Sequence, residues 1–518
     1  MLFSLTTTGD VRHKGVGCWR TATSQQKAAA RKKSSSPKGA EAESNIFIGK
    51  KRGLVILAEF PDKQFRGNHN IDIYNNILNA PDYTSEEGFR GSVADYFRDQ
   101  SAGLFELQFD VLGPYTTKNK VSYYGKNDED GYDEYAHEMV CEMCQAVDNM
   151  VNFADYDWDG DGEVDEVFVV YAGKGEFDGG GSNTIWPHMW TMDEAGVSLT
   201  LDGVKINVYA CSNELTSTGN ITGIGTICHE FSHCMGFPDF YDINYTGLFG
   251  MGNFDLMASG NTNGNSFIPV GYTAYEKMVC GWKTPIVLSD QDVVVDSMKP
   301  MSEHGDTYII YNDAYPDEYY MIENRQKTGW DEDYPAQGLM ITHIDYDAEV
   351  WFNNIPSSIF TYKEAIMNGY TCGNDHERMV LFHADNDDDR SYWSWGYYRK
   401  NTKSTDLYPY HKNDSLTSTS LPAATLYHKN SEGQKFMQGA ILDIKQNSDG
   451  TMGFRYRAKK PDAVDGIQTI GYGQEASDSH YQPSGLYDLQ GRKLSASGNP
   501  QVKKGLYIQD GRLVLKSK

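Results

Sequence analysis

The sequence predicts an α+β protein, and three observations support this fold class. Short apolar runs typical of buried strands, at residues 54–60 and 167–172, alternate with segments of helical spacing at 132–150 and 224–235. Beyond about residue 290, short strand-like runs follow one another, separated by Gly, Asp, Asn and Pro. The composition, 39% hydrophobic and 13% aromatic with 51 glycines, is sufficient for buried cores and favours many strands.

The elements of the first part follow from local patterns. Residues 54–60 form an apolar run that suits a buried strand, and residues 104–112 alternate like a strand. Ser92 is a potential N-cap for a helix that begins in the segment SVADYF. The helix predicted at 224–235 ends at Gly236, which is a favoured residue just beyond a helix.

The second part of the chain is predicted to be rich in strands. Its strand-like runs lie at residues 308–311, 319–323, 339–344, 379–383 and 452–456. The C-terminal segment contains two similar units, GLYDLQGRKL and GLYIQDGRLVL, each of which reads as two short strands around a polar-glycine turn.

These patterns divide the chain into five parts. We expect a disordered, basic tail at residues 1–48, followed by an α+β domain at 49–290 and a β-rich, sandwich-like domain at 291–460. A linker at 461–476 then leads to a small β module at 477–518.

Net charge argues against one class of partner, and hydrophobicity argues against a membrane-spanning segment. The net charge of −26 argues against binding to nucleic acid, because phosphate binding requires a cationic face. The longest apolar runs are far shorter than 18 residues, so the sequence contains no transmembrane segment.

The segment from Ile224 to Asp242 contains the motif that indicates chemistry. His229 and His233 lie one helical turn apart and therefore project from the same face, where two imidazoles can bind one tetrahedral Zn²⁺. Glu230 is adjacent to the first ligand, so its carboxylate can reach a water molecule at the metal and act as the catalytic base. The alternative is a pair of surface histidines on an ordinary helix.

The residues that follow extend the motif. Gly236 lies three residues after His233, and Asp239 lies three residues further, which matches a pattern in which the chain turns back to offer a third metal ligand. Asp242 and Glu323 are the alternative third ligands. Met257 lies downstream, where a Met-turn could form the floor of the zinc site.

A second metal site is predicted in the acidic loop that begins at residue 157. The spacing of its acids matches the first nine positions of a calcium-binding loop, with Gly162 at position 6, but position 12 is Phe168 instead of glutamate. Asp155 or Glu166 could supply the missing oxygen. The alternative is a solvated acidic loop, in which the carboxylates would repel one another. The predicted Ca²⁺ ligands are Asp157, Asp159, Asp161, Glu163 through its backbone carbonyl, and Asp165.

The acidic run at residues 385–389 is more simply explained as a charged loop, with a second cation site as the alternative.

With these motifs, the sequence resembles the immune inhibitor A family of secreted zinc metallopeptidases, particularly its Bacteroidetes versions. The residues that carry the resemblance include GLVILAEFPD, SVADYF, DWDGDGEVD, IWPH, the stretch from His229 to Asp242, and GLMITHID. The resemblance implies a metzincin-like catalytic domain followed by β domains. It also implies a signal and a pro-segment, of which residues 1–48 could be a remnant. The C-terminal module is similar to the sorting modules of Bacteroidetes type IX secretion.

The sequence therefore predicts a zinc metalloendopeptidase, secreted or displayed at the cell surface. We expect it to act as a monomer on proteins or peptides, with Zn²⁺ as the catalytic metal and Ca²⁺ as a structural one. The alternative is an inactive binding or adhesion protein on a protease scaffold, although no residue of the motif is missing.

Overall fold

The computed structural model mixes helices and strands, as predicted, in two compact units. These units comprise residues 1–459 and 460–518, and each is described by itself. Residues 1–45 of the predicted tail and the whole predicted linker lie outside the described part of the chain. The described residues are 46–128, 131–388, 391–394, 397–400, 403–459, 486–487, 493–495, 505–509 and 512–516.

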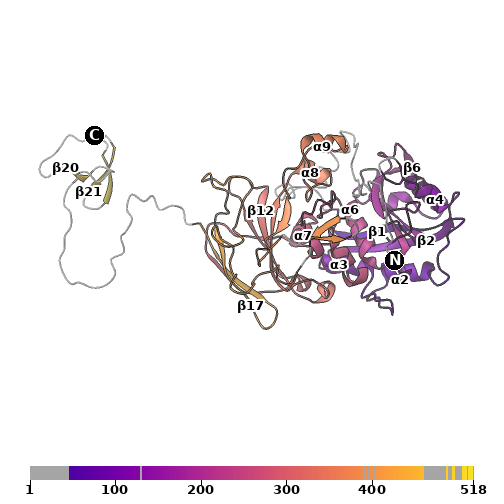
Figure 1. Ribbon diagram of the computed structural model, residues 1–518, viewed down its shortest axis with the longest axis horizontal. Helices are drawn as coiled ribbons and strands as arrows, with labels where there is room; N and C mark the ends of the chain where they lie inside the picture. Colours follow the sequence, from indigo (N-terminus) through magenta and orange to yellow (C-terminus); the bar gives the residue numbers. More distant parts are fainter. Residues whose placement is uncertain are drawn as a thin grey trace, which may run out of the picture. The chain divides into compact units, whose positions relative to one another are not determined.

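A five-stranded sheet forms the centre of the first part of the chain (Figure 1). Its strand order is β2-β1-β4-β8-β5, with four parallel strands and an antiparallel edge strand, β5, next to β8. The predicted strands at 54–60, 104–112 and 167–172 fall within or largely within β1, β2 and β4. The strands are β1 (Gly49–Glu59), β2 (Phe105–Thr116), β4 (Val167–Lys174), β5 (His188–Thr191) and β8 (Val208–Leu215).

Both faces of this sheet are buried, which explains the apolar character of β1. Leu54 and Ile56 point into one hydrophobic core, and Val55 and Leu57 into another on the opposite face. This alternation is expected for a mostly parallel sheet with helices on both faces. The helices are α2 (Ile71–Asn79), α3 (Val93–Gln100), α4 (Val121–Tyr124), α5 (Ala136–Val147), α6 (Ile224–Cys234) and α7 (Ala274–Val279).

Short elements complete the first part. A small sheet has the order β3-β7-β6. One 3-10 turn, η1, precedes this sheet, and two more, η2 and η3, follow α6. They are β3 (Glu163–Val164), β6 (Leu199–Leu201), β7 (Val204–Ile206), η1 (Phe153–Tyr156), η2 (Gly252–Phe254) and η3 (Ser259–Ser266).

Two sheets dominate the second part, in the orders β14-β13-β12-β11-β9 and β10-β18-β17. Residues of both sheets, such as Ile322 and Phe454, share a hydrophobic core. The strands are β9 (Ile286–Val287), β10 (Val293–Met298), β11 (Tyr308–Tyr311), β12 (Glu318–Arg325), β13 (Gly338–Asp345), β14 (Met379–Leu381), β17 (Ala440–Gln446) and β18 (Met452–Arg457).

Short helices, turns and one further strand pair lie in the connections between these strands. Helices α8 and α9 lie in the connection between β13 and β14, and β15 pairs with β16. They are η4 (Met301–Glu303), η5 (Gly329–Asp331), α8 (Ala348–Phe352), α9 (Tyr362–Met367), β15 (Ser391–Ser394) and β16 (Tyr397–Lys400).

The first and second parts are joined by a continuous core. Met321 and Met340 pack in the same hydrophobic cluster as Phe231 of α6. The fully buried Arg325 donates hydrogen bonds to the carbonyls of Gly271 and Tyr272, just before α7. Residues 46–459 therefore pack as one unit, and the subdivision at residue 290 stays a prediction.

The second unit contains a four-stranded sheet in the order β20-β19-β21-β22. It consists of two antiparallel pairs, as the two similar C-terminal sequence units predict. Its role as a sorting module stays a prediction. The strands are β19 (Leu486–Tyr487), β20 (Lys493–Ser495), β21 (Gly505–Gln509) and β22 (Arg512–Lys516).

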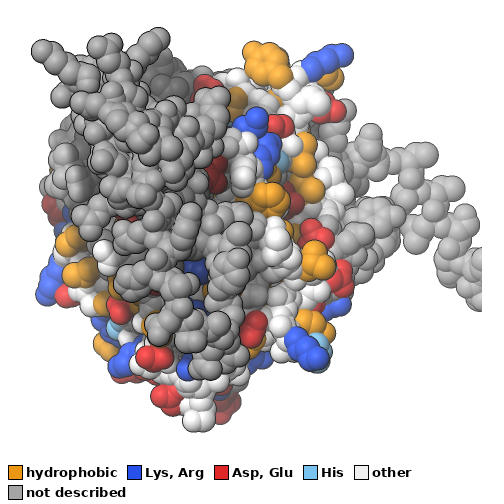
Figure 2. Space-filling model, turned by 90° about the vertical axis from the view of Figure 1, so that its left-hand side faces the viewer, with side chains coloured by type: hydrophobic (Ala, Val, Ile, Leu, Met, Phe, Trp, Pro, Cys, Tyr) orange, Lys and Arg blue, Asp and Glu red, His pale blue; other side chains and the backbone are white. Residues whose placement is uncertain are grey.

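Two further observations concern the surface and the helices. On the face in Figure 2, acidic, basic and hydrophobic side chains of described residues are interspersed. Among the described helices, none combines the length and hydrophobicity needed to cross a bilayer.

Candidate metal centre

Helix α6 carries the His-Glu-x-x-His motif and ends in a way that returns the chain to it. Gly236, at φ +97°, is in the left-handed region, which favours glycine. Its N–H donates to the His233 carbonyl at 2.8 Å, and the Phe237 N–H donates to the Ser232 carbonyl at 3.2 Å. These two bonds form a Schellman motif. The motif reverses the chain, so Asp239 comes back beside the two histidines.

Three buried side chains converge at this point. The Nε2 atoms of His229 and His233 each lie 3.3 Å from Oδ1 of Asp239. The exposed fractions of the three residues are 4%, 2% and 0%, so bulk water does not screen the site. The structure thus brings together the three residues that the sequence predicts as zinc ligands.

The hydrogen bonds of the two Nδ1 atoms indicate which ring nitrogens are free to bind a metal ion. The Nδ1 atoms of His229 and His233 lie 2.8 Å and 2.7 Å from the carbonyl oxygens of Leu256 and Phe237. A carbonyl only accepts, so each Nδ1 carries a proton in the neutral ring and each Nε2 presents a lone pair to Asp239.

Lone pairs and a carboxylate that face one another in a buried site fit a divalent cation. His233 Nε2 and Asp239 Oδ1 have no hydrogen bond partner among the described residues. When the rings are protonated instead, the positive charges of His233 and His229 outweigh the effect of burial and hold the pKa of Asp239 well below its usual range. Two imidazoles and one carboxylate are a donor set typical of catalytic zinc.

Glu230 lies beside this triad with the properties of a proton acceptor and donor. Its Oε2 atom is buried and has no hydrogen bond partner within the described residues. Burial, with the nearby charge of Asp239, raises the pKa of Glu230 to about 8, against the opposing effects of His229 and of a hydrogen bond from the backbone of Met189 on β5. A carboxyl group with such a pKa can take up and release a proton near neutral pH.

The two alternative third ligands are engaged elsewhere. Both carboxylate oxygens of Asp242 accept hydrogen bonds from its own loop, including the backbone N–H groups of Asn244, Thr246 and Gly247. Glu323 pairs with the guanidinium of Arg325 and accepts a hydrogen bond from the backbone of Ala274. Neither carboxylate belongs to the cluster around His229.

A cleft of about 320 Å³ opens onto the site. Glu230 and His229 form part of its wall, together with residues that precede and residues that follow α6 in sequence. Its larger apolar and aromatic lining residues are Phe177, Trp186, Tyr241, Tyr245, Leu248 and Phe249. The lining also includes polar side chains such as Thr226, Asn253 and Asn261. A cleft that combines aromatic rings with polar groups can bind an organic substrate and fix its orientation.

Comparison with known proteins shows what this part of the chain is similar to. A family model described as the immune inhibitor A peptidase M6 catalytic domain matches residues 47–279. We refer to residues 47–279 as the M6 domain, after the family model that they match. The match ends before β9, so it covers the central sheet and the metal centre but not the second part of the chain.

Two relatives are similar to part of the chain. Pre-pro-metalloprotease PrtV of Vibrio cholerae serotype O1 is 27% identical over 263 residues, which are 42% of this chain and 28% of the relative. Immune inhibitor A of Bacillus thuringiensis subsp. alesti is 26% identical over 243 residues, which are 39% and 35% of the two chains. The chain therefore spans about a third of the length of the curated relatives it matches.

Met257 lies next to the metal centre of the M6 domain. It is fully buried, and its carbonyl accepts a hydrogen bond of 2.7 Å from the N–H of Phe240, which directly follows Asp239. The preceding residue, Leu256, accepts the hydrogen bond from His229. The segment that carries Met257 thus orients one ligand and contacts the loop of another, as a floor of the site would.

The acidic loop of the M6 domain gathers part of the predicted calcium ligand set. Carboxylate oxygens of Asp157, Asp159 and Asp165 lie within 4.8 Å of one another. Asp161 is not in this group, and the Glu163 side chain pairs with Lys205 at 3.3 Å. The calcium site as a whole stays a prediction, and the structure gathers the side chains of only three of its five predicted residues.

The two residues considered for the missing calcium ligand differ in their surroundings. Asp155 pairs with Arg52. Glu166 is buried, and its two carboxylate oxygens have no hydrogen bond partner within the described residues. Burial, with the nearby charge of Asp165, raises the pKa of Glu166 well above its usual range.

Sequence analysis missed two features. His383, Asp385 and Asp406 form a third group of potential ligand atoms, and two of these residues lie outside the acidic run at 385–389. Asn354 hydrogen-bonds Asp239 from 115 residues downstream. No local pattern distinguishes this asparagine, because only the fold brings it to the metal centre.

Proposed function

We propose that the chain is a secreted zinc endopeptidase whose M6 domain hydrolyses peptide bonds. The observation that supports it most is the convergence of three buried side chains: the Nε2 atoms of His229 and His233 each lie 3.3 Å from Oδ1 of Asp239. Glu230 lies beside them in the wall of an open cleft. We propose that the three convergent residues hold the zinc. When bound there, zinc would act as a Lewis acid for the scissile carbonyl and for the attacking water.

The protein's own groups would handle the protons and orient the substrate. The buried Oε2 of Glu230 would accept the proton of the attacking water and then deliver it to the leaving amine. Strand β5 ends the central sheet, and the backbone of its Met189 reaches Glu230. The edge of β5 is therefore positioned to pair with an extended peptide in the cleft.

Casein hydrolysis tests this proposal. We expect activity that is lost on incubation with a chelator and restored by Zn²⁺. The alternative function, an inactive adhesion protein on a protease scaffold, predicts no hydrolysis under either condition. Absence of hydrolysis by a folded chain with zinc bound would therefore favour that alternative.

We further propose a structural Ca²⁺ in the acidic loop, held by Asp157, Asp159, Asp161, the Glu163 carbonyl and Asp165. The close approach of three of these carboxylates supports it, because they repel one another unless a cation is bound. Glu166 is the remaining candidate for an additional oxygen ligand.

Calcium is expected to raise the melting temperature of the protein. A ligand that binds only the folded state stabilises it by about 2.7 kcal/mol at a concentration 100 times its Kd. Melting curves with Ca²⁺ and with a calcium-selective chelator measure this shift. Asp157→Asn should abolish it, whereas Asp155→Asn, which changes a carboxylate paired with Arg52, should retain it. Identical curves for the wild type in both conditions would contradict the calcium site.

The cellular location is proposed on the relatives' names and on the C-terminal module. We expect a secreted or surface-displayed monomer, and fractionation of cells that express the native gene would test this. Recovery of the active enzyme only from the cytoplasm would contradict it.

A further inference from the structure

The connection between β13 and β14 packs against the loop that carries the third metal ligand. Figure 1 shows α8 and α9 of this connection close together, near the top of the view. Trp351 of α8 contacts the ring of Phe240, and Ser358 donates a hydrogen bond of 3.0 Å to Asp242. The Gly250 N–H donates to the Glu377 carboxylate at 2.7 Å. A segment outside the M6 match thus holds the ligand loop along its length.

One residue of this connection touches the ligand itself. The backbone N–H of Asp239 donates to Oδ1 of Asn354 at 2.5 Å, and Nδ2 of Asn354 donates to Oδ2 of Asp239 at 2.7 Å. An N–H can only donate and a carboxylate can only accept, so the orientation of the Asn354 amide is determined. Both residues are almost completely inaccessible to solvent.

This pair of hydrogen bonds determines which oxygen of Asp239 faces the histidines. The terminal torsion of an aspartate is broad, so an unrestrained carboxylate can rotate. With Oδ2 held by Asn354, Oδ1 stays at 3.3 Å from both imidazole Nε2 atoms. The amide is also neutral. It therefore orients the carboxylate without removing the negative charge that a divalent cation requires.

We propose that Asn354 is a positioning residue of the metal centre, which fixes the carboxylate of Asp239 for metal binding. The proposal rests on the proposed zinc site. It means that the metal centre is completed by the second part of the chain, outside the 47–279 match.

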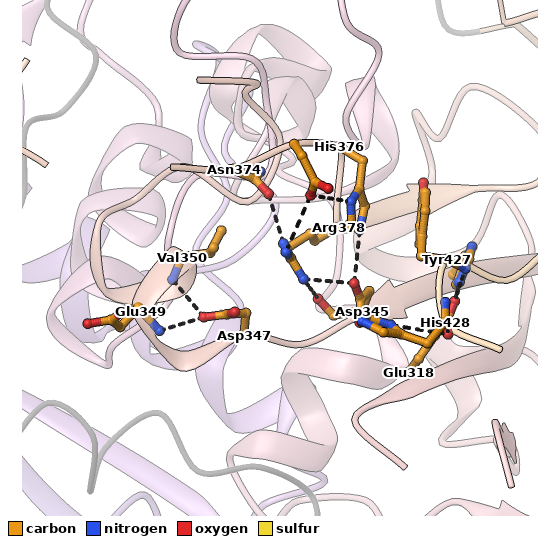
Figure 3. Close-up of polar contacts among 12 residues, drawn as sticks. Glu318, Asp345, Asp347, Glu349, Val350, Asn374, His376, Arg378, Tyr427 and His428 are labelled. Atoms are coloured by element: carbon orange, nitrogen blue, oxygen red, sulfur yellow. Dashed lines mark hydrogen bonds and ion pairs between the residues drawn. The ribbon is translucent and has the colours of Figure 1, made fainter. Parts of the chain in front are cut away.

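The polar network in Figure 3 anchors the segment on which Asn354 lies. Asp347 caps α8 by accepting from the N–H groups of Glu349 and Val350. At the other end, Arg378 donates to the Asp345 carboxylate at 2.7 Å, and His376 also contacts that carboxylate, at 2.9 Å. Asp345 is completely buried, so these bonds are shielded from water.

Bonds within the segment restrain the residues next to Asn354. The side chain of Asn374 donates to the carbonyls of Ile355 and Ser358, both at 2.9 Å. The Arg378 N–H donates to the carbonyl of Pro356 at 2.7 Å. Asn354 itself has φ +58°, a left-handed conformation that asparagine and glycine tolerate better than most residues. The amide is therefore presented to Asp239 by a restrained backbone.

The test compares metal binding by the full chain and by Asn354→Gly. Glycine keeps the left-handed backbone and removes both bonds to Asp239. Loss of a group that orients a metal ligand typically weakens metal affinity by about 10–100-fold, and we expect a rise of that size in the Zn²⁺ dissociation constant. Competition with a chromophoric chelator measures it. The visible spectrum of the Co²⁺-substituted protein, which reports ligand geometry, should change as well.

Two variants of the same segment serve as controls. Asn368→Gly makes the same substitution at a residue whose amide bonds only to the carbonyl of Glu364. Ser358→Ala removes a contact with the ligand loop but none with Asp239. Both should bind Zn²⁺ like the wild type and keep its Co²⁺ spectrum. Melting curves of the metal-free proteins establish that each variant is folded, and Asn354→Ala replaces Asn354→Gly if the latter is not.

The outcomes separate this proposal from the proposed function. Unchanged Zn²⁺ affinity and an unchanged Co²⁺ spectrum in a folded Asn354 variant would overturn the role of Asn354 while leaving the zinc site intact. An equal loss of affinity in either control variant would also overturn it, because general loosening of the segment would then be sufficient. A wild-type chain that binds no Zn²⁺ would overturn both.

Discussion

Glu230→Gln is expected to lower kcat/KM for peptide hydrolysis by about 10²–10⁴-fold, the usual contribution of a general acid–base group. This corresponds to about 3–5 kcal/mol of transition-state stabilisation. Glutamine has nearly the same shape as glutamate but cannot accept and return a proton. Because Glu230 is not one of the three convergent ligand residues, zinc content should not change.

Kinetics with a fluorogenic peptide and metal analysis of the same samples measure the two quantities. Glu106→Gln is a suitable control, since this carboxylate is exposed on β2 and its nearest cation is Lys50 at 3.6 Å. The Glu230 variant should be folded, loaded with zinc and nearly inactive, while the Glu106 variant keeps wild-type kinetics. Comparable turnover by the Glu230 variant would exclude it as the catalytic base, and loss of zinc would indicate that it supports the metal instead.

The parts of the site that could be predicted from the sequence are those with local signals. The helix predicted at 224–235 is α6, Ile224–Cys234, because helical spacing and the terminating Gly236 lie within one short stretch. The approach of Asp239 to the histidines also follows from local geometry, since the chain reverses at that glycine. The family resemblance is confirmed by the M6 match.

Features that depend on contacts distant in sequence could not be predicted. Asn354 meets Asp239 only after β12, β13 and the α8–α9 connection have folded against the M6 domain. The shared core of the two parts has the same origin, because the hydrophobic pattern of β12 does not show that Met321 packs in the same cluster as Phe231 of α6. In the acidic loop, sequence spacing gives the carboxylates but not the direction in which Asp161 points.

Asp239→Ala is expected to reduce zinc affinity by more than about 100-fold, the upper range for losing a residue that only supports a ligand. The change removes the one carboxylate that both histidines face. Asp242→Ala should leave zinc affinity close to that of the wild type. It should instead lower the free energy of unfolding by about 1–3 kcal/mol, because backbone N–H groups of the 242–248 loop and the hydroxyl of Ser358 lose their charged acceptor.

The two aspartates belong to one short loop, so their comparison separates metal binding from support of the loop. Asp242 accepts hydrogen bonds from Thr246 and Ser358, whereas Asp239 Oδ1 has no hydrogen bond partner within the described residues. Zinc titration and chemical unfolding of both variants should therefore give different patterns. Asp239→Ala should lose the metal and also some stability, because the buried Nδ2 of Asn354 loses its acceptor. Asp242→Ala should lose stability and keep the metal. Full zinc occupancy in Asp239→Ala, with loss of zinc in Asp242→Ala, would identify Asp242 as the third ligand and would require its loop to rearrange when the metal binds.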